Sequence, residues 1–122
     1  MQFLDKFENQ SYALFRIVTG FLFIWHGTQK LLGFPAEFPY PLNAMTTAAG
    51  GIEIIGGTLV MIGLFTRPAA FICSGTMAVA YWMVHGSQSF WPLLNGGEIS
   101  ALYSFAFLLI ACRGTGIWGI GK

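Results

Sequence analysis

The chain has 122 residues, of which 55% are hydrophobic and only 9% are charged, and its net charge is +1. A soluble domain of this size exposes much of its surface and carries roughly 25% charged residues, so the composition excludes an ordinary soluble globule and favours an integral membrane protein. The small net charge excludes a basic nucleic-acid-binding surface. Cys73 and Cys112 form no CxxC motif, so neither a disulfide framework nor a zinc knuckle is predicted.

The first predicted membrane span covers residues 11–32, close to the about 20 residues of helix that a bilayer core requires. The segment before it, MQFLDKFENQ, is polar, and no cleavage-site pattern follows the apolar stretch, so we expect a retained helix rather than a signal peptide. The segment GFPAEFPYP follows, and its three prolines cannot continue a long helix. It predicts a loop whose aromatic residues lie in the membrane interface.

Three more spans are predicted at residues 46–64, 68–85 and 98–113. The tight turn before the third places Pro68 in the first turn of a helix, where proline is tolerated. The segment GSQSFWPLLNGG separates the third and fourth spans and reads as a loop. Because short connections join antiparallel neighbours, the sequence predicts an all-α fold: one membrane-embedded four-helix bundle over residues 1–122.

The basic residues predict the orientation of this bundle. Lys6, Arg67, Arg113 and Lys122 flank one end of the predicted spans, whereas Lys30 is the only lysine or arginine at the other. The positive-inside rule therefore places both termini in the cytoplasm. Arg16 lies near the same inner end and is interpreted as an interface anchor.

Five ionisable residues are predicted to gather in the outer half of the bundle. They are His26, Lys30, Glu53, His85 and Glu98. Helix rise places the first and third of these about 10 Å below the outer surface, at matching depths. Ionisable groups in a bilayer are costly and commonly mark a functional site.

Glu53 shares a helix face with small residues, which predicts its direction. Gly50, Gly56 and Gly57 lie on that face at helical spacing. Because glycines let helix backbones approach closely, we expect Glu53 to point towards a neighbouring helix, and towards the first helix in particular.

Structural interpretations of these residues remain open at this stage. Asn95 and Glu98 have the spacing of a capping box, and His85 could cap a helix end. Lys30 could extend its ammonium to the membrane interface. Alternatively, either Lys30 or His26 could pair with Glu53 in a purely structural contact. The aromatic residues after the third span could form an interfacial belt or the wall of a ring-binding site. They are Tyr81, Trp82, Phe90 and Trp91.

Several short motifs in order resemble the DoxX family of small bacterial membrane proteins. They are R-x-x-x-G from Arg16, H-G-x-x-K-L-x-G from His26, E-x-x-G-G from Glu53, G-L-x-T-R-x-A-A from Gly63, N-G-G-E from Asn95 and G-x-G-x-W from Gly114. The resemblance covers almost the whole chain and implies a multi-pass, four-helix protein of the bacterial inner membrane. Some relatives are similar to a subunit of thiosulfate:quinone oxidoreductase, and others are linked to quinone handling or oxidative stress.

The favoured function is the binding of a quinone or quinol headgroup within a redox or oxidative-stress system. We expect His26 and Glu53 to exchange protons and Lys30 to stabilise negative charge on an oxygen. The remaining predicted ligand-binding residues are His85, Glu98, Asn95, Trp82 and Tyr81. No flavin, nicotinamide, haem or iron–sulfur motif is present in the sequence, so electrons would come from a partner subunit or a bound ligand.

Three other functions remain open. The first is a non-enzymatic membrane scaffold that anchors a soluble redox enzyme, which the missing cofactor motif favours. The second is a metal site built from the two histidines and two carboxylates, although no His-x-x-x-His or Glu-x-x-His pair supports it. The third is a small transporter. A homo-oligomer is also left open.

Overall fold

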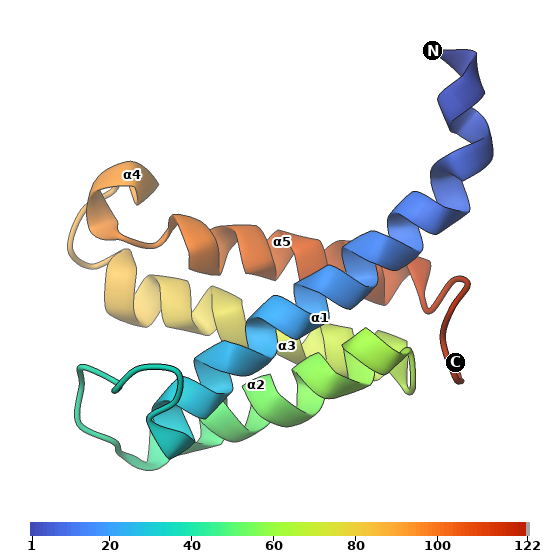
Figure 1. Cartoon of the computed structure of the whole chain (residues 1–122). Helices are drawn as coiled ribbons and strands as arrows, with labels where there is room; N and C mark the ends of the chain where they lie inside the picture. Colours follow the sequence, from blue (N-terminus) through green and yellow to red (C-terminus); the bar gives the residue numbers. More distant parts are fainter. Residues whose placement is uncertain (122) are drawn as a thin grey trace.

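The computed structural model describes residues 1–121, and these residues form helices joined by loops, with no strand among them. The all-α prediction is therefore confirmed. The elements are η1 Gln2–Phe7, α1 Glu8–Leu32, α2 Ala44–Ile62, α3 Thr66–Ala80, η2 Tyr81–His85, α4 Pro92–Asn95 and α5 Glu98–Arg113. Figure 1 shows α3 and α5 side by side, α2 beside α1, and α1 crossing the other helices obliquely.

The four predicted spans correspond to α1, α2, α3 with η2, and α5, with ends that agree to within one helical turn. The third span is not one regular α-helix, because its last residues, Tyr81–His85, form a π-helical turn. Two short elements were not predicted. η1 precedes α1, and α4 lies in the segment predicted as a loop, where Pro92 occupies a first-turn position that suits proline.

Two glycine pairs bring the backbones of α1 and α2 into contact. A Cβ atom added at Gly20 would lie 2.6 Å from the carbonyl oxygen of Gly57, and one added at Gly27 would lie 2.6 Å from that of Gly50. Real Cβ atoms do not approach an oxygen so closely, so both positions need glycine. This close approach sets how the two helices are rotated against each other.

The core connects α1 to the α3–α5 pair. The ring of Phe23 lies 4.6 Å from that of Phe107 and 5.1 Å from that of Tyr103, measured between centroids. Between α3 and α5, the hydroxyls of Ser74 and Ser104 each donate to the backbone carbonyl of the other residue, at 2.7 and 3.1 Å. These bonds satisfy polar groups inside an apolar bundle.

The prediction that Arg16 is an interface anchor is wrong. Its side chain is fully buried and donates to the Val60 carbonyl at 3.0 Å. The same guanidinium binds three carbonyls of the C-terminal tail, those of Thr115, Ile117 and Trp118. Burial of a charged group is stable only with such compensation, and five fixed donors make arginine suited to it. Arg16 therefore holds the tail against the bundle.

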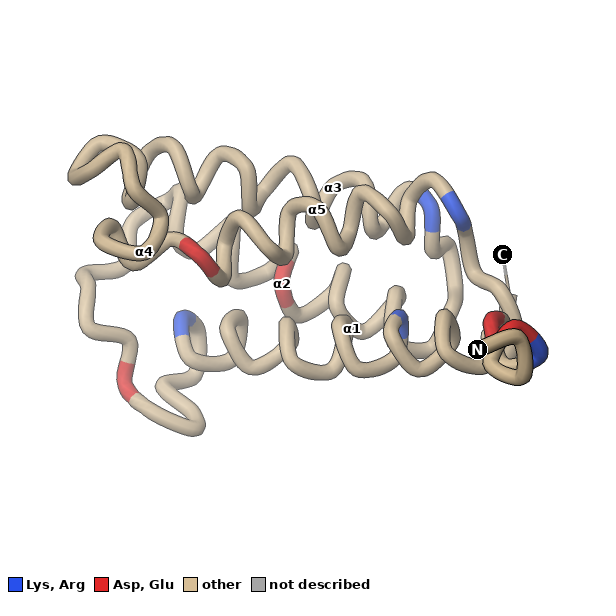
Figure 2. The backbone as a smooth tube through the Cα atoms, turned by 90° about the horizontal axis from the view of Figure 1, so that it is seen from above, with Lys and Arg blue, Asp and Glu red and all other residues tan. Residues whose placement is uncertain are grey.

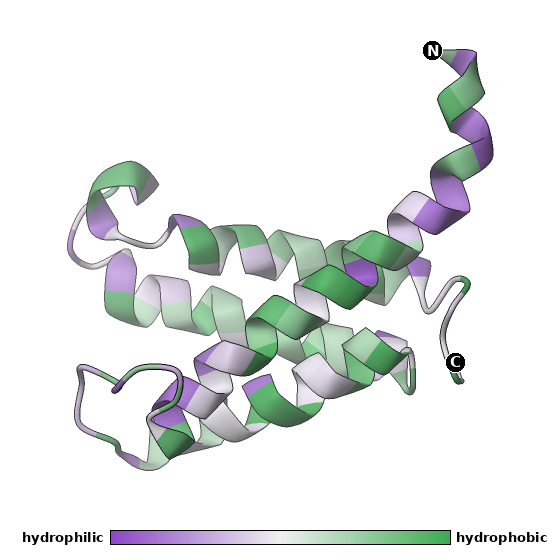
Figure 3. Ribbon diagram, in the orientation of Figure 1, coloured by the Kyte–Doolittle hydropathy of each residue, from purple (hydrophilic) through white to green (hydrophobic). Residues whose placement is uncertain are grey.

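The exposed surface of the helices is apolar along their middle parts, and charged residues lie near the helix ends. Figure 2 shows the charged residues near the ends of the long helices, with few between them. Figure 3 shows hydrophobic residues along the visible sides of α1 and α5. Exposed apolar side chains on these helices include Leu14, Val18, Phe21 and Leu22, then Phe71, Ile72 and Val79, then Leu102, Phe105 and Leu109. Among residues 1–121, one helix, Ala44–Ile62, is both long and apolar enough by itself to cross a membrane.

Candidate functional site

The best-defined polar contact between α1 and α2 joins Lys30 to Glu53. The Lys30 ammonium donates to the two carboxylate oxygens of Glu53 at 2.9 and 3.1 Å. Glu53 is 1% exposed and the Lys30 side chain is 16% exposed, so the pair is largely shielded from the outside of the molecule. Glu53 does contact the first helix, as its glycine-lined face predicted, and its partner is Lys30.

His26 lies one turn before Lys30 on α1 but is not bonded to the ion pair in the described part of the chain. Its imidazole is half-buried and meets the ring of Tyr103 edge-on, with 5.6 Å between ring centroids. It also lines a pocket of about 190 Å³, whose other lining residues are Trp25, Gln29, Pro35 and Ala36. The structure thus places His26 beside a small pocket rather than against Glu53.

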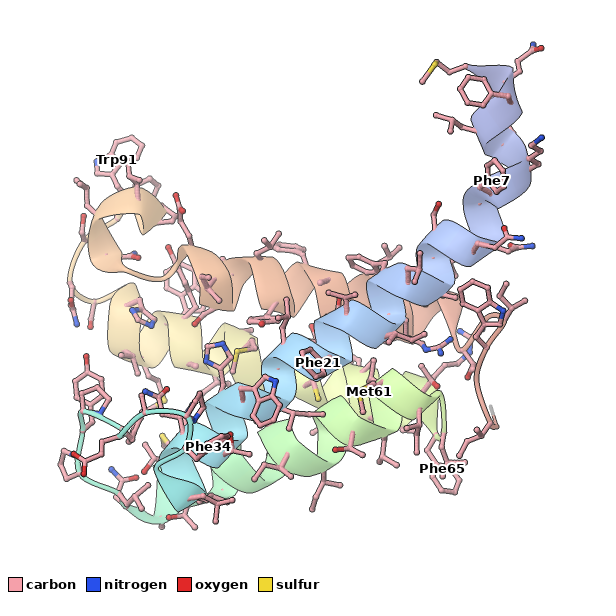
Figure 4. The ribbon with its side chains drawn as sticks, viewed as in Figure 1. Phe7, Phe21, Phe34, Met61, Phe65 and Trp91 are labelled. Atoms are coloured by element: carbon pink, nitrogen blue, oxygen red, sulfur yellow. The ribbon has the colours of Figure 1, made fainter. Side chains whose placement is uncertain are left out.

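The loop between α1 and α2 folds back over the C-terminal end of α1. The hydroxyl of Thr28 donates to the Phe34 carbonyl at 2.7 Å, and the Gln29 amide donates to the Glu37 carbonyl at 3.2 Å. Figure 4 shows Phe34 beside this end of α1. The loop also carries Phe38, whose ring centroid lies 5.4 Å from the Lys30 ammonium.

Beneath the loop lies a second, more open pocket of about 310 Å³. Its lining residues are Gln29, Lys30, Leu31, Gly33, Glu37, Phe38, Tyr40 and Leu42. Gln29 lines both pockets, so the two pockets lie next to each other. The Lys30 ammonium has three N–H donors and gives two hydrogen bonds to Glu53, which leaves one donor for an oxygen in this pocket.

A separate cluster of polar residues joins η2 to the end of α4. The amide of Asn95 donates to the Tyr81 hydroxyl at 3.2 Å and to the Ser89 carbonyl at 3.0 Å. His85 Nδ1 lies 3.0 Å from the Asn95 carbonyl oxygen, and the Asn95 side-chain oxygen accepts from Gly97 N–H at 2.7 Å. Asn95 is 4% exposed. These bonds hold the loop and leave Asn95 little capacity for a ligand.

Two residues of the predicted site stand apart from both polar groups. Glu98 is exposed, and it forms no hydrogen bond or ion pair among the described residues. Trp82 is 69% exposed on the outside of η2. The capping box between Asn95 and Glu98 does not form, because α5 begins after Gly97 and has no side-chain cap.

Sequence reasoning did not single out Trp25 or Gln29, which line the pocket beside His26. The sequence could have indicated Gln29, because it follows His26 by three residues and residues three apart lie on the same helix face. Pro35 and Ala36 had no such signal, since their position depends on how the loop folds back.

The match to known families decides which group of proteins this is. A family model described as DoxX matches residues 11–86. The chain belongs to the DoxX family. The matched region runs from α1 to η2 and contains Lys30, Glu53 and all lining residues of both pockets. Membership makes this a membrane protein in contact with the lipid bilayer.

Two relatives of this DoxX protein come from Haemophilus influenzae, and both are described only as uncharacterized proteins. One is 43% identical over 95% of this chain and 92% of its own length. The other is 25% identical over 75% of this chain and 64% of its own length. No solved structure matches the chain.

Metal-binding residue types do not gather in the described part of this DoxX protein. Within residues 1–121, no three side chains of His, Cys, Asp or Glu lie close enough together to hold a metal ion. Cys73 is buried and Cys112 is exposed, and the two are not joined by a disulfide. The two pockets at the C-terminal end of α1, one lined by His26 and the other by Lys30, are the candidate binding site.

Proposed function

We propose that this DoxX protein crosses the bacterial plasma membrane four times, with both termini in the cytoplasm. α1 has 25 residues and α2 has 19, which suits the about 20 residues that a span requires. α3 and η2 follow each other directly with 15 and 5 residues, and α5 has 16. The apolar side chains exposed along α1, α3 and α5 support contact of all these helices with lipid.

We further propose that the outer pocket beside His26 binds the ring headgroup of a quinone or quinol. The observation that carries this proposal is the composition of the pocket: the indole of Trp25, the imidazole of His26 and the amide of Gln29 line one small concavity. An indole gives an apolar surface to a flat ring, whereas the amide and the imidazole can hydrogen-bond the ring oxygens. The pocket lies at the end of α1, where a lipid-soluble headgroup can reach it.

The same residues have the chemistry that quinone reduction requires at the oxygens. Conversion of a quinone to a quinol takes up two electrons and two protons, one proton on each oxygen. The imidazole of His26 can relay a proton from water to one ring oxygen. The amide of Gln29 can donate to the other ring oxygen, which takes its proton from water. The electrons come from a redox partner protein that acts with this subunit.

Binding of a short-chain ubiquinone to the purified protein in nanodiscs tests the proposal. The informative variants are His26→Ala and Gln29→Leu, and His85→Ala is the matched control because His85 lies in the separate group around Asn95. We expect affinity to fall about tenfold or more in the first two, equivalent to about 1.4 kcal/mol each, and to stay unchanged in the control. Equal affinity in all four proteins contradicts a site at this pocket.

One observation favours the alternative, a membrane scaffold that anchors a soluble redox enzyme. Both oxygens of Glu53 already accept hydrogen bonds from Lys30, so the pair can act purely by joining α1 to α2. If the unmodified protein binds no quinone, the quinone proposal is wrong and the scaffold function takes its place.

A further inference from the structure

The N-terminal segment of the chain stands apart from the rest of the molecule. Residues 1–9 are all exposed, and an ion pair of 3.0 Å joins Glu8 of this segment to Arg113 of α5. Figure 1 shows the segment turned away from the axes of α3 and α5 and extending beyond the bundle. We refer to residues 1–9 as the N-terminal arm.

The arm is amphipathic in the conformation it adopts. In a 3₁₀-helix, side chains three residues apart lie above one another. Leu4 therefore shares one side of η1 with Phe7, Gln2 shares a second side with Asp5, and Phe3 shares the third with Lys6. Figure 4 shows Phe7 projecting from the arm, and Figure 3 shows hydrophobic and hydrophilic residues alternating along it. Leu4 and Phe7 are each 45% exposed, so the rest of the chain leaves this apolar side uncovered.

The apolar side of the arm continues into the exposed face of α1. From Leu4 onward, positions at alternating steps of three and four fall on one side of a helix. Those positions are Leu4, Phe7, Ser11, Leu14, Val18, Phe21 and Trp25, and every one of them is exposed. In the four-span topology proposed above, on which this inference rests, the part of this face on α1 contacts lipid, and the arm extends the same surface.

We propose that the N-terminal arm lies in the headgroup layer of the bilayer and anchors the start of α1 there. Leu4 and Phe7 would enter the boundary between headgroups and acyl chains, as the apolar side of an interfacial helix does. Lys6 can extend along the apolar surface to a lipid phosphate, and its ammonium already lies 5.3 Å from the centroid of the Phe7 ring. Asp5 and Gln2 face water. The inference rests on the membrane location and not on the ligand of the outer pocket.

Site-directed fluorescence in the full-length chain tests this proposal. An environment-sensitive probe is attached to Leu4→Cys, or to the matched control Asp5→Cys, in a Cys112→Ser background, where buried Cys73 is protected from labelling. The labelled proteins are reconstituted in vesicles of phosphatidylcholine and phosphatidylglycerol. We expect aqueous iodide to quench the Asp5 probe several-fold more strongly than the Leu4 probe, and lipids with a nitroxide near the headgroup to quench the Leu4 probe.

Two results would overturn the proposal. Equal quenching of both probes by iodide means that the arm stands free in water. Protection of the Leu4 probe from iodide without quenching by the nitroxide lipids means that protein covers the apolar side. A second copy of the chain is then the occupant if cross-linking through Leu4→Cys yields a covalent dimer.

Discussion

The ammonium of Lys30 and the carboxylate of Glu53 form a two-point contact, 2.9 and 3.1 Å long, between α1 and α2. Gly27 and Gly50 lie in the same contact between the helices, where the backbones approach too closely for a side chain. Glycine packing and the ion pair therefore act on the same pair of helices. Removal of either should loosen the region that carries both outer pockets.

A double-mutant cycle at Lys30 and Glu53 measures the strength of the pair. Loss of one partner leaves the other charge buried and unpaired, so we expect Lys30→Met or Glu53→Leu alone to destabilise by about 3 kcal/mol. The double variant should recover much of that loss, because no unpaired charge remains. Unfolding of the detergent-solubilised protein is the measurement. Strictly additive effects of the two substitutions would contradict a coupled pair.

Substitution of the helix-contact glycines should separate a packing role from simple helix propensity. Gly20→Ala brings a methyl group within 2.6 Å of the Gly57 carbonyl oxygen, and such overpacking costs about 1–3 kcal/mol. Gly51→Ala is the matched control, since a Cβ there meets no atom within 4 Å. Alanine favours helix over glycine by about 1 kcal/mol, so the control should be neutral or slightly more stable. Equal stability losses in the two variants would be inconsistent with the close α1–α2 contact.

Arg16→Lys should release the C-terminal tail. Lysine keeps the charge but lacks the planar fork that reaches several carbonyls at once. Hydrogen bonds to charged groups contribute about 1.5–3 kcal/mol each, so loss of two of them should cost about 3 kcal/mol. Chymotrypsin cleavage after Trp118, followed by mass spectrometry, should be several-fold faster in the variant. Arg113→Lys, at a partly exposed ion pair with Glu8, is the control and should leave the rate unchanged. Slow cleavage of Arg16→Lys would mean that other contacts hold the tail.

The proposed topology predicts which positions a membrane-impermeant maleimide can reach in intact spheroplasts. In a Cys112→Ser background, Glu37→Cys in the loop before α2 should be labelled from outside, and Gln2→Cys should be labelled only after the membrane is opened. Both side chains are exposed, so access depends on the side of the membrane rather than on burial. Labelling of Gln2→Cys in intact cells would reverse the orientation.

The sequence alone was sufficient to predict the four long helical segments. Apolar runs mark their interiors, and clusters of glycine and proline such as GFPAEFPYP mark their ends, because these residues cannot continue a regular helix. The direction of Glu53 was also predictable. Its glycine-lined face admits a neighbouring backbone, and a buried carboxylate requires a partner.

Only the tertiary structure decided which partners the other polar residues take. Arg16 binds backbone carbonyls 99 to 102 residues away in sequence, and carbonyls carry no sequence signature of their availability. His26 and Glu98 seemed to converge with Glu53 because helix rise gives depth. Depth does not give the rotation of each helix about its own axis. Contacts between helices, such as that of Gly20 with Gly57, determine this rotation. Local periodicity therefore determined the helices of this protein, whereas the contacts between helices decided its site.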